Sequence, residues 1–271
     1  MTSSKSKRAV DFKIPRHLRC HDPAWLAKRW RAIAPKAGLS VSSFAKAHGH
    51  SILQAVTKNP AKSKPWIYFS AGIHGDEPAS TEALLAWIER NTALACSLNL
   101  RIFPCLNPWG LENNCRLDAD GRDLNRCYRN PSHPPVAAHS RLAQKNHYEL
   151  ALVLHEDFDA QGVYVYETSP LKPYLGERLI AAMSRHIPSD PRRRIDSSRA
   201  KGGVIRRKVT PDLIPDWPEA FLLHFHCAER VFTIETPSEF HIEARVEAHI
   251  AAIDAAIASL GLGIEFKSRG N

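Results

Sequence analysis

Residues 65–78, PWIYFSAGIHGDEP, combine a short apolar run with a turn that contains two glycines, a histidine and two acidic residues. The run Trp66–Ala71 is bounded by a proline and a glycine, which is typical of a buried β-strand. Pro78 suits the first turn of a helix, and helical periodicity continues from Thr81 to Leu94. The stretch therefore predicts a strand, a tight turn and a helix in direct succession.

The rest of the chain repeats this alternation of short apolar runs and longer helical segments. Further strands are expected at 51–56, 98–105, 150–154, 163–166 and 231–234, and further helices at 22–34, 171–186 and 242–260. The pattern predicts an α/β fold with a mixed, largely parallel central sheet and helices on both faces. Residues 1–20 are expected to form a polar tail and residues 21–271 a single domain.

The composition is that of a globular protein. Of the 271 residues, 44% are hydrophobic and 24% are charged, which argues against disorder or a coiled coil. No apolar run approaches the ~18 residues of a membrane-spanning helix, so no membrane association is expected. The six cysteines form no CxxC pair and no export signal is visible, which predicts reduced thiols and a cytoplasmic location.

The charge is strongly basic and unevenly distributed. Lys and Arg number 37 against 28 Asp and Glu, a formal net charge of +9, and the excess is concentrated between 192 and 208. No recognisable nucleic-acid module accompanies the basic segment, so no nucleic-acid partner is expected. The segment is interpreted either as a solvated loop or as a feature that favours acidic peptides.

Residues that could bind a metal ion follow two of the predicted strands. His74 and Glu77 are three residues apart at the turn after Trp66–Ala71, where they can converge on one ion. His155 ends the run 150–154, and it would complete a His, Glu, His set. Three protein ligands with an open fourth position are typical of a catalytic zinc.

Two further groups follow strands and are expected at the same edge of the sheet. Arg116, Asn125 and Arg126 come after the strand at 98–105, and guanidinium and amide groups recognise carboxylates. Glu235 follows the strand at 231–234, where its carboxylate could take a proton from metal-bound water.

Taken together, these motifs resemble the zinc carboxypeptidase family of the carboxypeptidase A type, over about 65–237. The resemblance implies one zinc ion held by His74, Glu77 and His155, with Glu235 as general base and acid. It also implies that Arg116 stabilises the oxyanion and that Asp123 orients His74. Asn125 and Arg126 match the pair that holds the free C-terminal carboxylate of a peptide.

The sequence departs from this family at two points. The family usually supplies a substrate-gripping tyrosine shortly before the catalytic glutamate, but no tyrosine follows Tyr174. Tyr164 or Tyr166 could replace it, although core packing is the simpler interpretation. The interval from Glu77 to His155 is also short, as in bacterial murein-peptide amidases and the aspartoacylase and succinylglutamate desuccinylase branch.

Three functions therefore stay open. The leading interpretation is a metallocarboxypeptidase that cleaves the C-terminal bond of a short peptide. The second is an N-acyl-amino-acid deacylase, and the third is a zinc-binding protein without catalysis. His224 and His226, expected on one side of a strand, are interpreted as pocket lining or surface rather than a second metal site, and Glu156 and Asp157 are left unassigned. The oligomeric state is not predicted.

Overall fold

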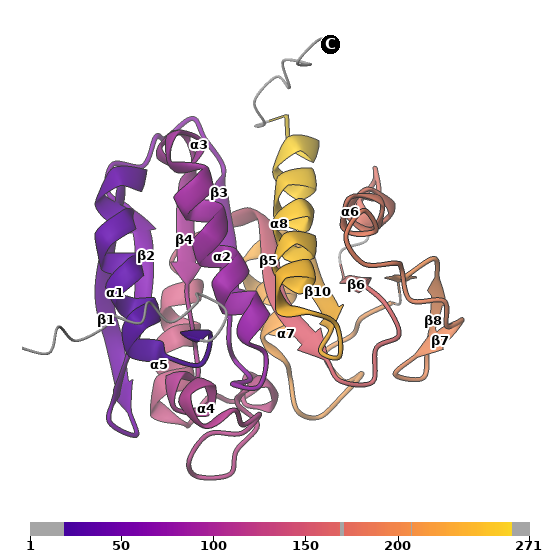
Figure 1. Ribbon diagram of the computed structural model, residues 1–271, viewed down its shortest axis with the longest axis horizontal. Coiled ribbons are helices and arrows are strands. Elements are labelled where there is room, and N and C mark those ends of the chain that lie inside the picture. Colours follow the sequence, from indigo (N-terminus) through magenta and orange to yellow (C-terminus); the bar gives the residue numbers. More distant parts are fainter. Residues whose placement is uncertain (1–18, 169–170, 207, 262–271) are drawn as a thin grey trace, which may run out of the picture.

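Strand β3, Trp66–Ala71, is formed by the apolar run within residues 65–78. It lies near the middle of the sheet (Figure 1). The computed structural model describes residues 19–168, 171–206 and 208–261. β3 is flanked by two parallel strands, β4 (Asn99–Phe103) and β5 (Tyr148–Asp157). β5 pairs in parallel with β10 (Ala228–Pro237), so four adjacent strands at the centre run in one direction.

Antiparallel pairs extend the sheet on both sides of this centre. In the described part of the chain the strand order is β1-β2-β4-β3-β5-β10-β6-β9-β8-β7. β2 is antiparallel to β1 and to β4, β6 is antiparallel to β10, and β9 is parallel to β6. The bounds of these outer strands are Leu39–Ala47 (β1), His50–Thr57 (β2), Tyr164–Glu167 (β6), Arg194–Ile195 (β7), Ser198–Lys201 (β8) and Val204–Ile205 (β9). The predicted mixed α/β class is confirmed, with parallel pairing concentrated at the centre.

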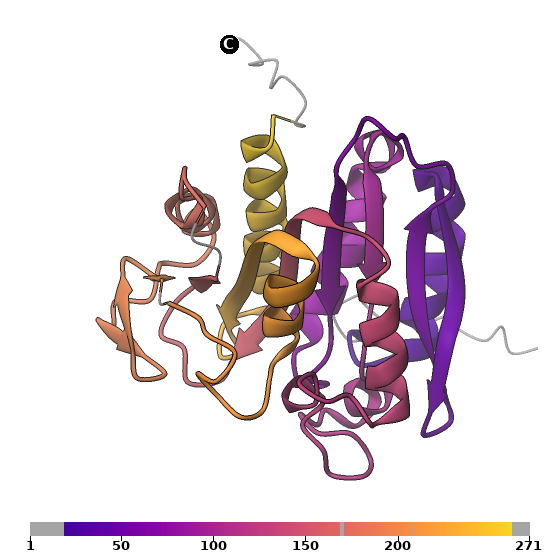
Figure 2. The same cartoon turned by 180° about the vertical axis from the view of Figure 1, so that it is seen from behind.

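Helices cover both faces of the sheet, as predicted. α1 (Pro23–Ile33), α2 (Pro78–Arg90), α6 (Gly176–Met183) and α8 (Ile242–Ser259) pack on one face (Figure 1). α5 (Pro134–Ala143) and α7 (Glu219–His226) lie on the other face (Figure 2). Two short helices, α3 (Thr92–Ser97) and α4 (Pro108–Asn113), follow α2 and β4. Each face has its own cluster of buried apolar side chains, and these clusters bury the central strands on both sides.

Most of the predicted elements are present. The strands predicted at 51–56, 98–105, 150–154, 163–166 and 231–234 correspond to β2, β4, β5, β6 and β10. The helix predicted at 22–34 is α1, which Asp22 caps by accepting a hydrogen bond from the Trp25 amide at 2.7 Å. The helix predicted at 171–186 is shorter, because α6 spans only Gly176–Met183. The helix predicted from Thr81 to Leu94 is divided at Asn91 into α2 and α3. Strands β1, β7, β8 and β9 and helices α4 and α5 were not predicted.

The prediction of a strand at His224–His226 is wrong, because these residues form the end of α7. The helix contains a continuous apolar run, Ala220–Leu223, whose side chains are all buried. A short run that is apolar on every side carries no periodicity, so it does not distinguish a buried strand from a buried helix.

Some predictions fall outside the described residues or receive no test. Nearly all of the tail predicted at 1–20 lies outside them, and the single domain predicted at 21–271 stays a prediction. All six cysteines lie within the described residues and are free thiols. Among the described helices none has the length and apolar character needed to cross a membrane.

The parallel centre determines where functional side chains meet. β3, β5 and β10 point the same way, so their carboxyl ends share one edge of the sheet. Gly72–Glu77 follow β3, His155 lies near the end of β5, and Glu235 lies near the end of β10. Ligands of α/β proteins bind at this edge.

Candidate metal centre and active site

The turn between β3 and α2 is held by a close approach of two backbones. A Cβ added at Gly75 would stand 1.8 Å from the carbonyl carbon of Gly110 in α4. The Gly75 amide also donates a hydrogen bond to the Cys115 carbonyl oxygen at 3.0 Å. Glycine is therefore required here, and packing against α4 sets the direction in which His74 and Glu77 point.

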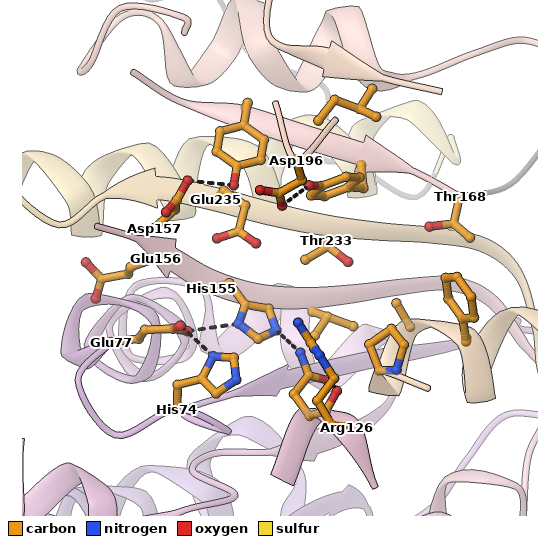
Figure 3. Close-up of a pocket in the computed structure, with 18 of the residues that line it drawn as sticks. His74, Glu77, Arg126, His155, Glu156, Asp157, Thr168, Asp196, Thr233 and Glu235 are labelled. Atoms are coloured by element: carbon orange, nitrogen blue, oxygen red, sulfur yellow. Dashed lines mark hydrogen bonds and ion pairs between the residues drawn. The ribbon is translucent and has the colours of Figure 1, made fainter. Parts of the chain in front are cut away.

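The structure brings the three predicted metal ligands together. His74 Nδ1 lies 2.6 Å from Glu77 Oε1, and His155 Nδ1 lies 2.9 Å from Glu77 Oε2 (Figure 3). All three side chains are buried, with Glu77 only 3% exposed. One donor atom from each residue lies within 4.8 Å of the other two. The donors converge on one small region, as a shared metal ion requires.

Asp123 and Arg116 surround His74. Asp123 Oδ1 lies 3.1 Å from His74 Nε2, the ring nitrogen that faces away from Glu77. Arg116 donates to Asp123 Oδ2 from Nη2 at 2.9 Å, and its Nη1 lies 3.2 Å from His74 Nδ1. The predicted contact between Asp123 and His74 is therefore present, and the Arg116 guanidinium lies beside the metal donors.

The charges of these groups are strongly coupled. Burial alone would raise the pKa of Glu77, but the charges of His74 and His155 outweigh it and hold that pKa well below its usual range. Burial would likewise lower the pKa of His74, whereas the carboxylates of Glu77 and Asp123 raise it to about 9. The protonated imidazoles supply the positive charge that the buried carboxylate needs. A divalent cation would supply the same charge after displacing their protons.

The donor chemistry fits zinc. Two imidazole nitrogens and one carboxylate oxygen match the ligands of catalytic zinc sites, which keep one position open. The outer nitrogen of His74 also has an acceptor that orients the ring, Asp123 Oδ1 at 3.1 Å.

Glu235 is placed beside the metal donors by the register of the sheet. It pairs with His155 of β5 on one side and with Tyr164 of β6 on the other. Directly paired residues point to the same face, so the Glu235 carboxylate faces the donors (Figure 3). Burial raises its pKa well above the usual range and outweighs the opposing effect of His155. A carboxyl group with a raised pKa is suited to exchange protons near neutral pH.

One cavity of about 350 Å³ joins these groups. Asp123 does not line the cavity, but it contacts Nε2 of His74, on the side of the ring that faces away from Glu77. All the other predicted site residues line the cavity: His74, Glu77, Arg116, Asn125, Arg126, His155 and Glu235. The structure therefore assembles the predicted constellation in one place.

Asn125 and Arg126 differ in how far their side chains are already engaged. The Asn125 amide oxygen accepts a hydrogen bond from the Glu219 amide at 2.8 Å, while its nitrogen faces His155. Arg126 donates to the Asn125 carbonyl oxygen at 2.9 Å, and within the described residues it forms no ion pair. Arg126 is therefore the guanidinium in the cavity that is available to an anionic ligand.

Negatively charged side chains line the cavity on the side of β6 and the β7–β8 turn. Tyr164 donates to Asp157 Oδ2 at 2.9 Å, and Tyr166 donates to Asp196 Oδ2 at 2.6 Å (Figure 3). Both tyrosines reach the cavity, and so do Asp157 and Asp196. Asp196 was not predicted as a site residue; its signal in the sequence is a single acid within the basic segment 192–208.

Among the described residues of the basic segment no arginine lines the cavity, and Arg192 lies 3.9 Å from Asp157, which does line it. Of the segment's described residues, Asp196 and Ile205 line the cavity. Arg192 binds Asp190 at 2.6 Å, and Arg206 pairs with the carboxylates of Glu167 and Glu177. The positive charge of this segment is therefore partly neutralised by acids of the protein itself.

Glu156, which was left unassigned, points away from the metal donors (Figure 3). It lies between His155 and Asp157 on β5, so its side chain is on the other face of the sheet. There it accepts a hydrogen bond from the Ala79 amide at 2.6 Å and pairs with Arg245 of α8. Its role is to join the start of α2 to α8.

Comparison with known proteins agrees with this site. A family model described as "Succinylglutamate desuccinylase/Aspartoacylase catalytic domain" matches residues 63–163. This range contains the three candidate metal donors and the motif Asp123–Arg126, and it ends before Glu235. No curated protein matches the sequence.

Solved structures share the fold over most of this chain. A candidate metallopeptidase from Shewanella denitrificans OS217 has a TM-score of 0.78 and 23% identity, covering 89% of this chain and 91% of that one. A metallo-carboxypeptidase from Burkholderia cenocepacia has a TM-score of 0.66 and 16% identity, covering 87% and 68%. The chain therefore has the same fold as these metallopeptidase and metallo-carboxypeptidase structures.

A second metallo-carboxypeptidase, from Pseudomonas aeruginosa in complex with (2-guanidinoethylmercapto)succinic acid, has a TM-score of 0.60 and 19% identity, and the match covers 87% of this chain and 68% of that one. The resemblance inferred from the motifs is thereby confirmed. The family match and the His-Glu-His donor set together support a metal-dependent hydrolase.

Zinc affinity is expected to rise with pH. His74 has a pKa of about 9 without metal, and zinc binds only the neutral imidazole, so binding must displace its proton. Between about pH 6 and about pH 8 the apparent affinity should increase about tenfold per pH unit for each proton displaced. Competition with a zinc-chelating dye at a series of pH values measures this slope.

The matched variant for this titration is Asp123→Asn, which removes one contact of His74 and should weaken zinc binding roughly 10- to 100-fold. An affinity that stays constant over the same pH range would show that no protonated histidine is displaced, and would contradict the assignment of His74.

Proposed function

We propose that the protein is a zinc-dependent metallocarboxypeptidase that hydrolyses the C-terminal amide bond of short peptides. The observation that carries this proposal is that one cavity joins the three metal donors, the carboxylate of Glu235 and the available guanidinium of Arg126. A metal, a base and a cationic group for a carboxylate are the parts that cleavage at a free C-terminus requires.

Glu235 is the proton carrier in this proposal. His74, Glu77 and His155 would hold the zinc ion. When bound, zinc polarises a carbonyl oxygen and lowers the pKa of water. Glu235 accepts a proton from the attacking water and returns it to the leaving amine. Its pairing with His155 across the β5–β10 ladder keeps the carboxylate at the reacting centre throughout.

The two arginines act on different parts of the substrate. Arg116, whose guanidinium lies beside His74, stabilises the negative charge that develops on the carbonyl oxygen. Donors in this role contribute roughly 2.7–4 kcal/mol each. Arg126 binds the terminal carboxylate and thereby selects the last bond of the peptide. Asn125 has a second amide hydrogen, which can donate to the same carboxylate.

The alternative is an N-acyl-amino-acid deacylase, which the description of the matched family favours. The charge of the cavity favours the peptidase. Asp157 and Asp196 line its wall on the side of β6; Asp157 lies 3.9 Å from Arg192, and Asp196 is in no ion pair among the described residues. A succinyl or similar acyl group carries its own carboxylate, which this wall would repel, whereas a cationic group of a peptide would be attracted.

The variant Glu235→Gln is expected to lower kcat about 10²- to 10⁴-fold, because it keeps the shape of the side chain and removes the proton acceptor. Zinc content should stay at the wild-type level. The matched control is Glu239→Gln, an exposed acid beyond the end of β10 that should change neither quantity. Wild-type turnover by Glu235→Gln with its zinc retained would exclude Glu235 from the reaction.

Wild-type protein is expected to hydrolyse a peptide with a free C-terminus roughly 10²-fold faster than its amidated twin, because only the free peptide offers Arg126 a carboxylate. Arg126→Ala should remove this difference by slowing cleavage of the free peptide. Arg129→Ala is the control, since Arg129 pairs with Asp212 at the surface. Faster turnover of N-acyl amino acids than of any free peptide would favour the deacylase.

The acidic wall is expected to select a substrate cation. Asp196→Asn should raise KM about fivefold for a peptide that ends in lysine, which corresponds to the ~1 kcal/mol of a partly exposed ion pair. A peptide that ends in methionine should be hardly affected. Asn keeps the acceptor for Tyr166 and tolerates the positive φ of 46° at this position. Equal effects on both peptides would show that Asp196 does not contact the terminal side chain.

A further inference from the structure

A second group of metal-binding side chains lies outside the active-site cavity. His48, Asp118 and Asp120 each place one donor atom within 4.8 Å of the others. His48 is in the turn between β1 and β2, and the two acids are in the loop that leads to Asp123–Arg126. None of these three residues takes part in the proposed reaction.

Asp118 is the centre of this group. Its side chain is almost completely buried, and the residue is 3% exposed. Its Oδ1 accepts hydrogen bonds from the backbone amides of Asp120 and Arg122, at 3.0 and 2.9 Å. No hydrogen bond reaches its Oδ2 within the described residues. A buried carboxylate oxygen without a partner is costly unless something binds it.

The groups that face Asp118 Oδ2 are imidazole nitrogens. His48 Nε2 is 3.8 Å away and His133 Nε2 is 3.5 Å away. His48 Nε2 is itself buried without a hydrogen bond in the described part of the chain. It also lies 4.0 Å from Asp120 Oδ2. Two buried atoms without a hydrogen-bond partner among the described residues, Asp118 Oδ2 and His48 Nε2, therefore lie close together beside Asp120 Oδ2.

The spacing of these atoms fits a metal ion better than it fits direct hydrogen bonds. Ligands at about 2.0–2.2 Å from a tetrahedral metal stand about 3.3–3.6 Å from one another. The distances of 3.5 to 4.0 Å in this group are close to that range and exceed a normal hydrogen bond.

One interaction competes with a cation at this place. Arg122 donates to Asp120 Oδ2 at 2.6 Å, which would have to be released or shared. Both side chains of this pair are about half exposed, 49% and 48%. Exposed ion pairs contribute only about 0–1 kcal/mol, so Asp120 can exchange this partner for a metal.

The group is also reachable from solvent. A surface pocket of about 580 Å³ is bordered by His48, Asp120 and His133. A cavity of about 10 Å³, the size of roughly one water molecule, is bordered by His48, Asp118 and His133. An ion can therefore enter from the pocket and meet the buried oxygen of Asp118.

We propose that His48, Asp118 and Asp120 bind a second divalent metal ion, with His133 beside Asp118 as a further donor. Nitrogen and carboxylate donors in this combination suit Zn²⁺. The ion joins the β1–β2 turn to the loop 118–126, which carries Asp123, Asn125 and Arg126. It is a structural site that supports the loop, and the chain then binds two metal ions.

The test is a count of zinc per chain after dialysis against buffered micromolar free Zn²⁺. Wild type is expected to hold two ions, His74→Ala one, His48→Asn one, and the double variant none. His147→Ala is the control, because His147 is exposed and belongs to neither group of metal-binding side chains. This variant should hold two zinc ions. Asn is chosen at position 48 because it tolerates the positive φ of 49°.

A wild-type count of one that is lost in His74→Ala and unchanged in His48→Asn would overturn the proposal. Thermal unfolding provides a second readout that needs no activity. Zinc should raise the Tm of His74→Ala, since a ligand that binds only the folded state stabilises it, and should not raise the Tm of the double variant. The count and the Tm shift are independent of hydrolysis, so the second site and the peptidase can fail separately.

Discussion

One buried carboxylate connects the active site to the fold. The two oxygens of Glu77 meet the Nδ1 atoms of His74 and His155, which come from the ends of different strands. A carboxylate as buried as this one keeps its charge only if positive charge lies beside it, because water no longer compensates it. The two histidines provide that charge, so the turn after β3 and the end of β5 are electrostatically joined. Arg116 and Asp123 extend the same network to the loop after β4.

The parts of this network that depend on local sequence could be predicted. The strand, turn and helix of 65–78 need only an apolar run, two glycines and a proline, and these lie within fourteen residues. Helix α1 is likewise predicted by its cap, Asp22, and by its periodicity. The ends of β5 and β10 were located because apolar runs stop at His155 and shortly before Glu235. Their convergence followed from the rule that parallel strands place ligands at one edge.

Features that depend on distant contacts could not be read in this way. The apolar run of α7 has the same composition as a buried strand, and only its packing against β10 and β5 makes it a helix. That Asn125 binds the Glu219 amide is decided by the place of α7, nearly one hundred residues further along the chain. Asp196 faces the cavity because the β7–β8 turn folds over β6, whereas in the sequence it is hidden among arginines. The unsatisfied oxygen of Asp118 is visible only once β1 and α5 are in place.

The ladder between β5 and β10 has a consequence for how such a protein can diversify. Glu235 and His155 are held together by backbone hydrogen bonds of adjacent strands, and not by the seventy residues that connect Asp157 to Ala228. That connecting segment supplies Tyr164, Tyr166 and Asp196 to the cavity wall. Changes in the β7–β8 turn, which carries Asp196, alter the cavity wall, while the β5–β10 ladder keeps Glu235 beside His155. Part of the cavity wall and the candidate metal site thus lie in different segments of the chain, so the wall can diverge while the His155–Glu235 pairing is kept.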